Sequence, residues 1–492
     1  MNPVNLADLF VGLSNQWADR TAIVSPRLTL SYRDLAIRAA RSARELRTRG
    51  VARGSNVGIA VRDSGEAIAL MLALWMLDAV PVSIDFRTRP GERLSLADEF
   101  DLIALIEDRP KPDTSGYTSI LVDQAWTDFI GRHDGEPVCE PRSTAPALIS
   151  LSSGTTGRLL GIVLDHESLL FRLKSNLQLG RRRPGGRLLN AIPISSSGSR
   201  NHALSHLFDG GTVIFHPPLF GAGEFTEAIL SQKATSVCVV PTLLHGLLDL
   251  HGHRATPLFA DLDALYCFGA PFSPAEKRRA RACLGEHLVE GYSSTVSGRI
   301  SVLYGDDMQA RPDTVGRVLP HVLLQIVDGE DVPLPVGEAG LIRVRSPAMA
   351  GSIYRDVTRM TGDRIRDGWA YPGDIGVLEG EGFLRLVGRA SDIIIRGGVN
   401  VHPLEIETAL AEHPGIKEVA VVSIPQAREG EEIAAFVVAA GDLTETALVA
   451  HCRARLAPDK RPRKFVFLSK LPRNANGKIV RAELRRKLEE ER

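Results

Sequence analysis

Leu148-Ile-Ser-Leu-Ser-Ser-Gly-Thr-Thr-Gly157 is the stretch from which the fold is most readily inferred. An apolar run, typical of a buried strand, leads into small hydroxyl and glycine residues. Gly154 and Gly157 allow a tight turn whose consecutive amide N–H groups can point at phosphate oxygens. Further hydroxyl donors are Ser152, Ser153, Thr155 and Thr156. No Gly-Lys-Ser/Thr follows, so this is not a Walker loop, and taken alone the stretch also fits a polar loop between two strands.

Apolar and amphipathic segments alternate on both sides of this stretch. Helices are predicted at 32–49, 67–77, 224–232 and 242–250, and strands at 56–61, 79–84, 212–215 and 236–240. Such alternation is typical of α/β layers with largely parallel sheets. After about Arg311, the segments 322–327 and 341–345 alternate apolar and polar residues, which predicts antiparallel strands with one solvated face.

The chain after Asp392 has a separate pattern of short predicted strands and helices. We expect a strand at 393–396, a helix at 403–412, strands at 419–424 and 433–439, and a helix at 444–456. About a hundred residues of this kind can form a small α+β domain. The predicted organisation is therefore a large N-terminal domain at 1–390 and a small C-terminal domain at 391–492.

Composition excludes several classes of protein. The chain has 492 residues, too many for one compact core, and its net charge of +0 gives no global attraction to nucleic acid or to an anionic membrane. Its five cysteines show no CxxC or Cys/His spacing, which favours a reducing compartment over a disulfide scaffold or a structural zinc site. The most apolar stretch, 67–82, is broken by Asp78 and Pro81 and is too short to span a bilayer. We therefore expect a cytoplasmic protein with no nucleic-acid partner and no membrane span.

The stretch 153–157 resembles the nucleotide loop of the adenylate-forming superfamily, which contains acyl- and aryl-CoA synthetases, peptide-synthetase adenylation domains and firefly luciferase. The resemblance covers nearly the whole chain, with the further motifs in the family's order at 268–274, 291–295, 371–374, 387–407 and 471–481. It implies a large N-terminal domain of two α/β subdomains and a β-barrel-like subdomain, followed by a small mobile α+β domain.

By this resemblance, several groups of residues surround ATP. The phosphates would be held by Ser152, Ser153, Gly154, Thr155, Thr156 and Gly157. The adenine pocket would be lined by the backbone of Gly269, Ala270 and Pro271. Tyr292 would stack on the adenine, Asp374 would accept hydrogen bonds from both ribose hydroxyls, and Arg389 would contact the ribose.

The resemblance also implies the catalytic residues and a rotation between two half-reactions. Lys478 would bridge the substrate carboxylate and the α-phosphate as pyrophosphate leaves, and Thr295 would hydrogen-bond a phosphate. The C-terminal domain would then turn about a hinge at Asp392 and admit a thiol past Gly397 and Gly398. Thiol attack on the acyl-AMP would displace AMP and leave a thioester.

Three positions near the expected ATP phosphates depart from the family pattern. The family usually has Pro-Lys-Gly after the phosphate loop, whereas this chain has Leu159, Leu160 and Gly161. Val296 stands where the family has a glutamate that holds Mg²⁺, and a valine cannot coordinate a metal. Mg²⁺ would then be held mainly by ATP, and we predict no metal-ligating residue in the protein.

These observations leave three functional interpretations. The leading one is an acyl- or aryl-CoA ligase that uses ATP and CoA to activate a carboxylic acid. The second is a stand-alone adenylating enzyme that loads the phosphopantetheine of an acyl carrier protein. The third, which Leu160 and Val296 suggest, is a degenerate member that binds nucleotide or acyl-adenylate with weak or no ATP turnover. By the resemblance, peptide-synthetase relatives hold the ammonium of an amino acid with an Asp in the segment that corresponds to 194–202. This segment contains no acid here, which disfavours an amino acid substrate. We also expect that a homodimer can form.

Overall fold

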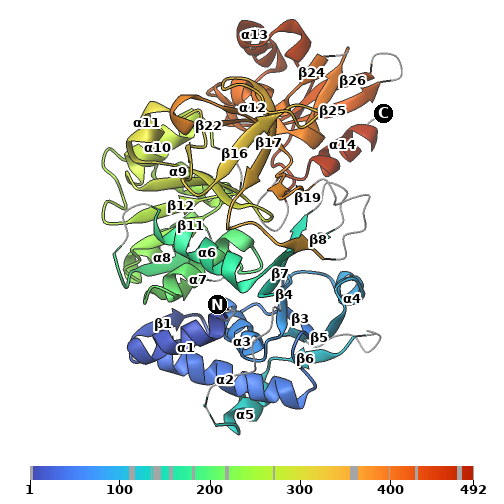
Figure 1. Ribbon diagram of the computed structural model, residues 1–492. Helices are drawn as coiled ribbons and strands as arrows, with labels where there is room; N and C mark the ends of the chain where they lie inside the picture. Colours follow the sequence, from blue (N-terminus) through green and yellow to red (C-terminus); the bar gives the residue numbers. More distant parts are fainter. Residues whose placement is uncertain are drawn as a thin grey trace.

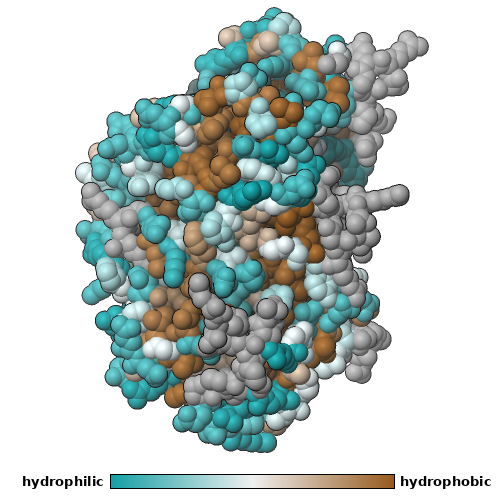
Figure 2. All heavy atoms as spheres, in the orientation of Figure 1, coloured by the Kyte–Doolittle hydropathy of each residue, from teal (hydrophilic) through white to brown (hydrophobic). Residues whose placement is uncertain are grey.

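The computed structural model describes residues 4–109, 117–134, 136, 146–153, 159–179, 183–216, 221–269, 272–354, 364–397, 399–426, 430–473 and 479–490. The chain forms a large N-terminal part with a smaller C-terminal unit at its top (Figure 1). Polar residues cover most of the face in Figure 2, with apolar side chains in separate patches. Among the described helices, none is long and apolar enough to cross a membrane.

A seven-stranded sheet with the order β18-β8-β7-β4-β3-β5-β6 carries the phosphate-loop segment. Its strands are β3 (Asn56–Ala60), β4 (Val80–Ser83), β5 (Leu102–Glu107), β6 (Ser119–Leu121), β7 (Leu148–Ser153), β8 (Leu159–Leu164) and β18 (Ser352–Ile353). Strands β3 to β7 pair in parallel, as the alternation predicts. Strand β8 runs antiparallel to β7, so the phosphate loop connects the two strands of a hairpin.

A nine-stranded sheet, β15-β14-β13-β12-β11-β9-β10-β1-β2, forms the second α/β layer. Its strands are β1 (Thr21–Val24), β2 (Thr29–Ser31), β9 (Arg187–Asn190), β10 (Thr212–Phe215), β11 (Ser236–Val239), β12 (Ala264–Cys267), β13 (Leu288–Ser294), β14 (Gly298–Tyr304) and β15 (Arg317–Val318). The central strands are parallel and the two edges are antiparallel.

The helices of the N-terminal part are α1 (Leu6–Gln16), α2 (Tyr32–Thr48), α3 (Ser64–Met76), α4 (Pro90–Glu99), α5 (Gln124–Gly131), α6 (His166–Leu177), α7 (Ser197–Leu207), α8 (Ala222–Ser231), α9 (Pro241–His251), α10 (Pro274–Cys283) and α11 (Gly305–Ala310). Helix α3 begins three residues before the predicted start, because the Asp63 side chain accepts hydrogen bonds from the amides of Gly65 and Glu66. From Gly65 onward every residue of α3 is buried, since this helix is apolar on all sides and shares one core with strands of both large sheets.

A six-stranded antiparallel sheet follows, as predicted for the chain after Arg311. Its strands are β16 (Leu323–Val327), β17 (Ala339–Arg345), β19 (Ile365–Arg366), β20 (Trp369–Ala370), β21 (Asp374–Leu378) and β22 (Leu384–Arg389), with the short helices η1 (Gly380–Gly382) and η2 (Ala390–Asp392). The predicted hinge residue Asp392 thus ends η2, two residues before the C-terminal sheet begins.

The C-terminal unit is a five-stranded sheet with helices on both faces. It contains β23 (Ile394–Arg396), β24 (Val399–Val401), β25 (Ile416–Gln426), β26 (Gly430–Ala439) and β27 (Lys464–Phe467), with helices α12 (Pro403–Ala411), α13 (Glu445–Arg455), η3 (Pro458–Lys460) and α14 (Arg481–Glu490). Strand β26 explains the layering, because its residues alternate between two cores. Ile433 and Ala435 pack with α12 and α13, whereas Ala434 and Phe436 pack with α14. The predicted α+β character is confirmed.

Candidate active site

A cavity of about 1500 Å³ lies where the two large sheets, the six-stranded sheet and the C-terminal unit meet. The predicted site residues that line it are Ser152, Gly269, Tyr292, Thr295, Asp374, Arg389 and Asp392. Residues from five motifs spread over 240 positions of sequence, from 152 to 392, thus come together. Ser153 ends β7, and the remaining predicted positions Gly154, Thr155, Thr156, Gly157, Ala270, Pro271, Gly398 and Lys478 lie outside the described residues.

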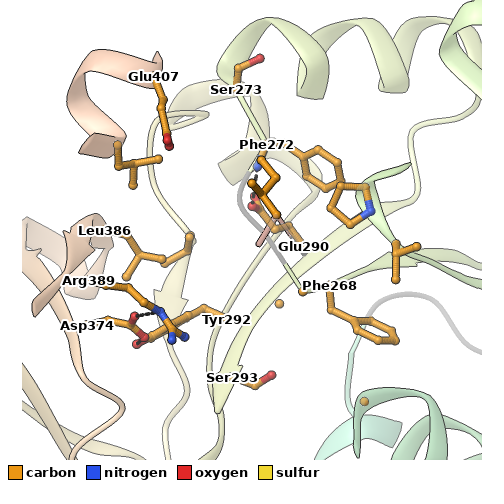
Figure 3. A pocket seen from close by; sticks show the side chains of 18 of the residues that line it. Phe268, Phe272, Ser273, Glu290, Tyr292, Ser293, Asp374, Leu386, Arg389 and Glu407 are labelled. Carbon is orange, nitrogen blue, oxygen red and sulfur yellow. Dashed lines mark hydrogen bonds and ion pairs between the residues drawn. The ribbon is translucent and has the colours of Figure 1, made fainter. Parts of the chain in front are cut away.

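Tyr292, Asp374 and Arg389 form one hydrogen-bonded group (Figure 3). The Tyr292 hydroxyl donates to Asp374 Oδ2 at 2.7 Å, and Arg389 Nε lies 3.1 Å from Asp374 Oδ1. Strands β21 and β22 pair Asp374 directly with Arg389, which explains why these side chains meet. Burial and the neighbouring Asp374 carboxylate raise the pKa of the Tyr292 phenol well above its usual value. Tyr292 therefore stays protonated and fixes one oxygen of Asp374.

The base of the phosphate loop is closed by the β7–β8 hairpin. Ser152 pairs with Leu160, and Ser153 pairs with Leu159. Ser152 lines the cavity, whereas the Leu160 side chain packs against the main hydrophobic core. Leu160, which the motif comparison aligns with the usual family lysine, is therefore used for packing in this chain.

The turn after β13 is held by an arginine that sequence motifs did not identify. Arg172 on α6 donates from Nε to Ala348 O at 2.7 Å, from Nη1 to Thr295 O at 3.1 Å and from Nη2 to Val296 O at 3.1 Å. Burial lowers the pKa of Arg172 to about 9. A lone arginine within a helix carries no local signal, so only the tertiary structure reveals this support for Thr295.

Val296 lines the cavity but is almost fully buried, with an exposed fraction of 3%. A valine side chain offers no oxygen, so Val296 does not fit a direct Mg²⁺ ligand. Within the described ranges, no group of three or more His, Cys, Asp or Glu is arranged to hold a metal. His202 and His206 both lie on α7 and are buried, and His202 Nε2 lies 2.9 Å from Arg299 Nη2.

The C-terminal unit contributes Arg473, Ile479 and Arg481 to the cavity wall. Arg473 and Ile479 pair through an isolated antiparallel bridge, and both line the cavity. Arg481 Nη2 donates to Glu407 Oε1 at 2.6 Å, and Arg481 Nη1 lies 3.8 Å from Asp392 Oδ2.

Of the two glycines of the predicted thiol passage, Gly397 lies within the described residues. Gly397 occupies the turn between β23 and β24 with φ of +56°, a left-handed conformation that favours glycine. It is not among the residues lining the cavity. An added Cβ there would have no atom within 4 Å, which leaves room for a close-approaching ligand.

Comparison with known proteins agrees with this geometry. A family model described as AMP-binding enzyme matches residues 13–354, and one described as AMP-binding enzyme C-terminal domain matches residues 405–478. The chain belongs to the AMP-binding enzyme family. The resemblance inferred from the motifs is therefore confirmed.

Relatives and solved structures of this family cover almost the whole chain. A 2-succinylbenzoate–CoA ligase from Bacillus cereus is 31% identical over 96% of each chain. An indoleacetate–CoA ligase from Aromatoleum aromaticum is 31% identical over 96% of this chain and 97% of the relative. ATP-bound MatB from Rhodopseudomonas palustris superposes with a TM-score of 0.90 at 28% identity over 99% of each chain. The predicted AMP-binding fold, with a large N-terminal and a small C-terminal part, is confirmed.

Proposed function

We propose that the protein activates a carboxylic acid with ATP as acyl-AMP and then transfers the acyl group to the thiol of CoA. Family membership and relatives that are CoA ligases support this class of acid–thiol ligase. The observation that carries the proposal at atomic level is the shared cavity. It joins the Tyr292–Asp374–Arg389 group to Arg473 and Ile479, which flank Lys478.

In the first half-reaction, the N-terminal part would position the nucleotide. Both Asp374 oxygens already have donors, and the Asp374 carboxylate can accept further hydrogen bonds from the ribose hydroxyls because each oxygen has more than one lone-pair site. Lys478 would stabilise the negative charge that develops between the substrate carboxylate and the α-phosphate. Since Val296 does not fit a direct metal ligand, we propose that Mg²⁺ is held mainly by the phosphates of ATP, and we derive no step from it.

In the second half-reaction, the C-terminal unit would rotate about Asp392 and bring the Gly397–Gly398 turn to the cavity. The contacts that must break include an exposed ion pair between Lys417 on β25 and Asp249 on α9, at 2.7 Å. Exposed pairs of this kind contribute little, about 0–1 kcal/mol, so they do not prevent rotation. Withdrawal of Lys478 would make room for the thiol, whose attack on the acyl carbon releases AMP.

A carboxylic acid panel tests the proposal. We expect carboxylate-dependent ATP–pyrophosphate exchange with at least one acid, and thioester formation when free CoA is added. Exchange without a thioester on free CoA, but with transfer to a holo acyl carrier protein, would favour the carrier-loading alternative. Bound ATP with no exchange for any acid would favour the degenerate binding member that Leu160 and Val296 suggest.

We further propose a cytoplasmic setting and a homodimer. The described cysteines, Cys238, Cys267, Cys283 and Cys452, are free and buried, which suits a reducing compartment. Cell fractionation and light scattering of the purified protein would test the two statements separately.

A further inference from the structure

The guanidinium of Arg299, which lines the cavity, has no acidic partner among the described residues. Arg299 on β14 lies opposite Ser293 on β13, and both line the cavity. Within the described part of the chain, Arg299 forms no ion pair, and its Nε has no hydrogen-bond partner. Burial lowers the pKa of Arg299 to about 10, so the group remains a cation at neutral pH.

The surroundings of Arg299 confine it to one side of the cavity. Arg299 Nη2 donates to His202 Nε2 at 2.9 Å, which requires the neutral His202 ring to carry its proton on Nδ1. His202 stacks on Phe268 with ring centroids 5.7 Å apart and an interplanar angle of 11°. In Figure 3, Phe268 lies across Ser293 from the Asp374–Arg389 pair. The contacts of Arg299 with His202, and of His202 with Phe268, share no residue with the Tyr292–Asp374–Arg389 group that we assign to the ribose.

The sequence makes room for this guanidinium at Gly291. A Cβ at position 291 would collide with Arg299 Nη1. Asn201, which precedes His202 on α7, also lines the cavity, and its buried Oδ1 has no hydrogen-bond partner. This side of the cavity therefore offers a cation and an amide with unused hydrogen-bonding capacity.

The buried side chains around the cavity also carry an excess of positive charge. Arg172 and Arg200 are buried and are held by backbone carbonyls and a serine hydroxyl, with no acid in ion-pair distance among the described residues. The buried acids that line the cavity among the described residues are already paired: Asp374 with Arg389, Glu290 with Lys277 at 2.6 Å, and Glu407 with Arg481 at 2.6 Å. Since a buried cation is costly without an anion, this excess of positive charge favours a negatively charged ligand.

We infer that the acid substrate carries a second carboxylate, which the guanidinium of Arg299 binds while the first carboxylate reacts with ATP. This inference rests on the proposed function, since it names the class of acid that the site activates. A planar guanidinium can donate two parallel hydrogen bonds to a carboxylate. An acid without the second carboxylate would leave the half-buried Arg299 guanidinium without an anionic partner, so the site selects dicarboxylic acids over monocarboxylic acids of the same length.

The test compares dicarboxylic acids from malonate to suberate with the monocarboxylic acid of the same carbon number, and adipate with its monomethyl ester. In ATP–pyrophosphate exchange, we expect the best diacid to exceed its monoacid in kcat/KM by roughly 100-fold. Arg299→Gln should remove most of that preference by slowing the diacid and leaving the monoacid within about threefold. Arg299→Lys, which keeps the charge but loses the planar fork, should retain an intermediate preference.

Arg317→Gln is the matched control, because Arg317 lies on the neighbouring strand β15, pairs with Asp307 and does not line the cavity. It should leave the diacid preference unchanged. Equal or better use of monoacids by the wild type would overturn the inference while leaving the proposed ligase activity intact. Equal losses for diacid and monoacid in Arg299→Gln would also overturn it.

A binding measurement separates the inference from the activity. Titration of adipate and hexanoate into the AMP-loaded full chain, followed by calorimetry, should show that wild type prefers adipate and that Arg299→Gln does not. If adipate bound in this Arg299-dependent way but no acid in either series supported exchange, the proposed function would fail and the diacid site would stand. Equal binding of both acids would refute the diacid site.

Discussion

The hydroxyl of Tyr292 lies 2.7 Å from Oδ2 of Asp374 and joins strand β13 of the nine-stranded sheet to strand β21 of the six-stranded sheet. Tyr292→Phe keeps the ring and removes this bond. Loss of a hydrogen bond to a buried carboxylate costs about 1.5–3 kcal/mol. We therefore expect a lower midpoint temperature of thermal unfolding and a KM for ATP that is raised roughly 10-fold. The change in kcat should be small. Thermal unfolding and ATP titration of the exchange reaction measure both effects, and a normal KM for ATP would contradict the role of Tyr292 in ordering Asp374.

Lys478→Ala separates the two half-reactions. We expect at least about 100-fold slower ATP–pyrophosphate exchange, since the charge that stabilises the departing pyrophosphate is lost. Thioester formation from chemically prepared acyl-AMP should change by only a few-fold. Rapid-quench assays of each half-reaction provide the measurement. Lys487 on α14 serves as the control lysine, and equal losses in both halves for Lys478→Ala would mean that its role is misassigned.

Lys417 and Asp249 form an ion pair that holds the C-terminal unit against α9. Lys417→Glu would replace the attraction by repulsion and should slow exchange by about two- to fivefold relative to thioester formation from acyl-AMP. The double variant Lys417→Glu/Asp249→Lys should restore the wild-type ratio. Because the pair is exposed, 0.5 M NaCl (roughly a 4 Å screening length) should reduce the difference. If Lys417→Glu left the ratio of exchange to thioester formation unchanged, this contact would not affect the rotation of the C-terminal unit.

We predict that His166 makes the folding stability of the protein sensitive to acid. Burial lowers its pKa from 6.5 to about 4, and its Nδ1 accepts a hydrogen bond from the amide of Leu6 at 3.2 Å. Between these pH values the unfolded chain binds a proton that the folded chain does not, so stability falls as the pH drops from 6.5 toward 4. The loss should reach about 3 kcal/mol at the lower end.

Urea unfolding from pH 4 to pH 8 measures this contribution. His166→Gln keeps an acceptor for the Leu6 amide but cannot titrate, so its stability should depend less steeply on pH in the same window. His253, which is exposed, provides the control substitution. Parallel pH profiles for wild type and His166→Gln would rule out His166 as the source.

Much of the secondary structure could be predicted from local patterns. The helix predicted at 32–49 is α2 (Tyr32–Thr48), and the strand predicted at 212–215 is β10 (Thr212–Phe215). The largest difference is β25 (Ile416–Gln426), which extends beyond the predicted 419–424 because it pairs along most of its length with β26. Apolar periodicity fixes the type of an element, whereas partner strands decide where it ends. The domain boundary at 390 and the roles of the site residues stay predictions.

The sequence by itself determined the family, the order of the motifs and most helices and strands, because these depend on residues close together in the chain. Only the tertiary structure decided that Asp374 is held between Tyr292 and Arg389, that Arg172 supports the turn at Thr295, and that Arg299 meets His202 without an acidic partner. Arg299 and His202 are 97 positions apart. Contacts over such distances arise from the packing of whole sheets and helices, and no local spacing of residues encodes them.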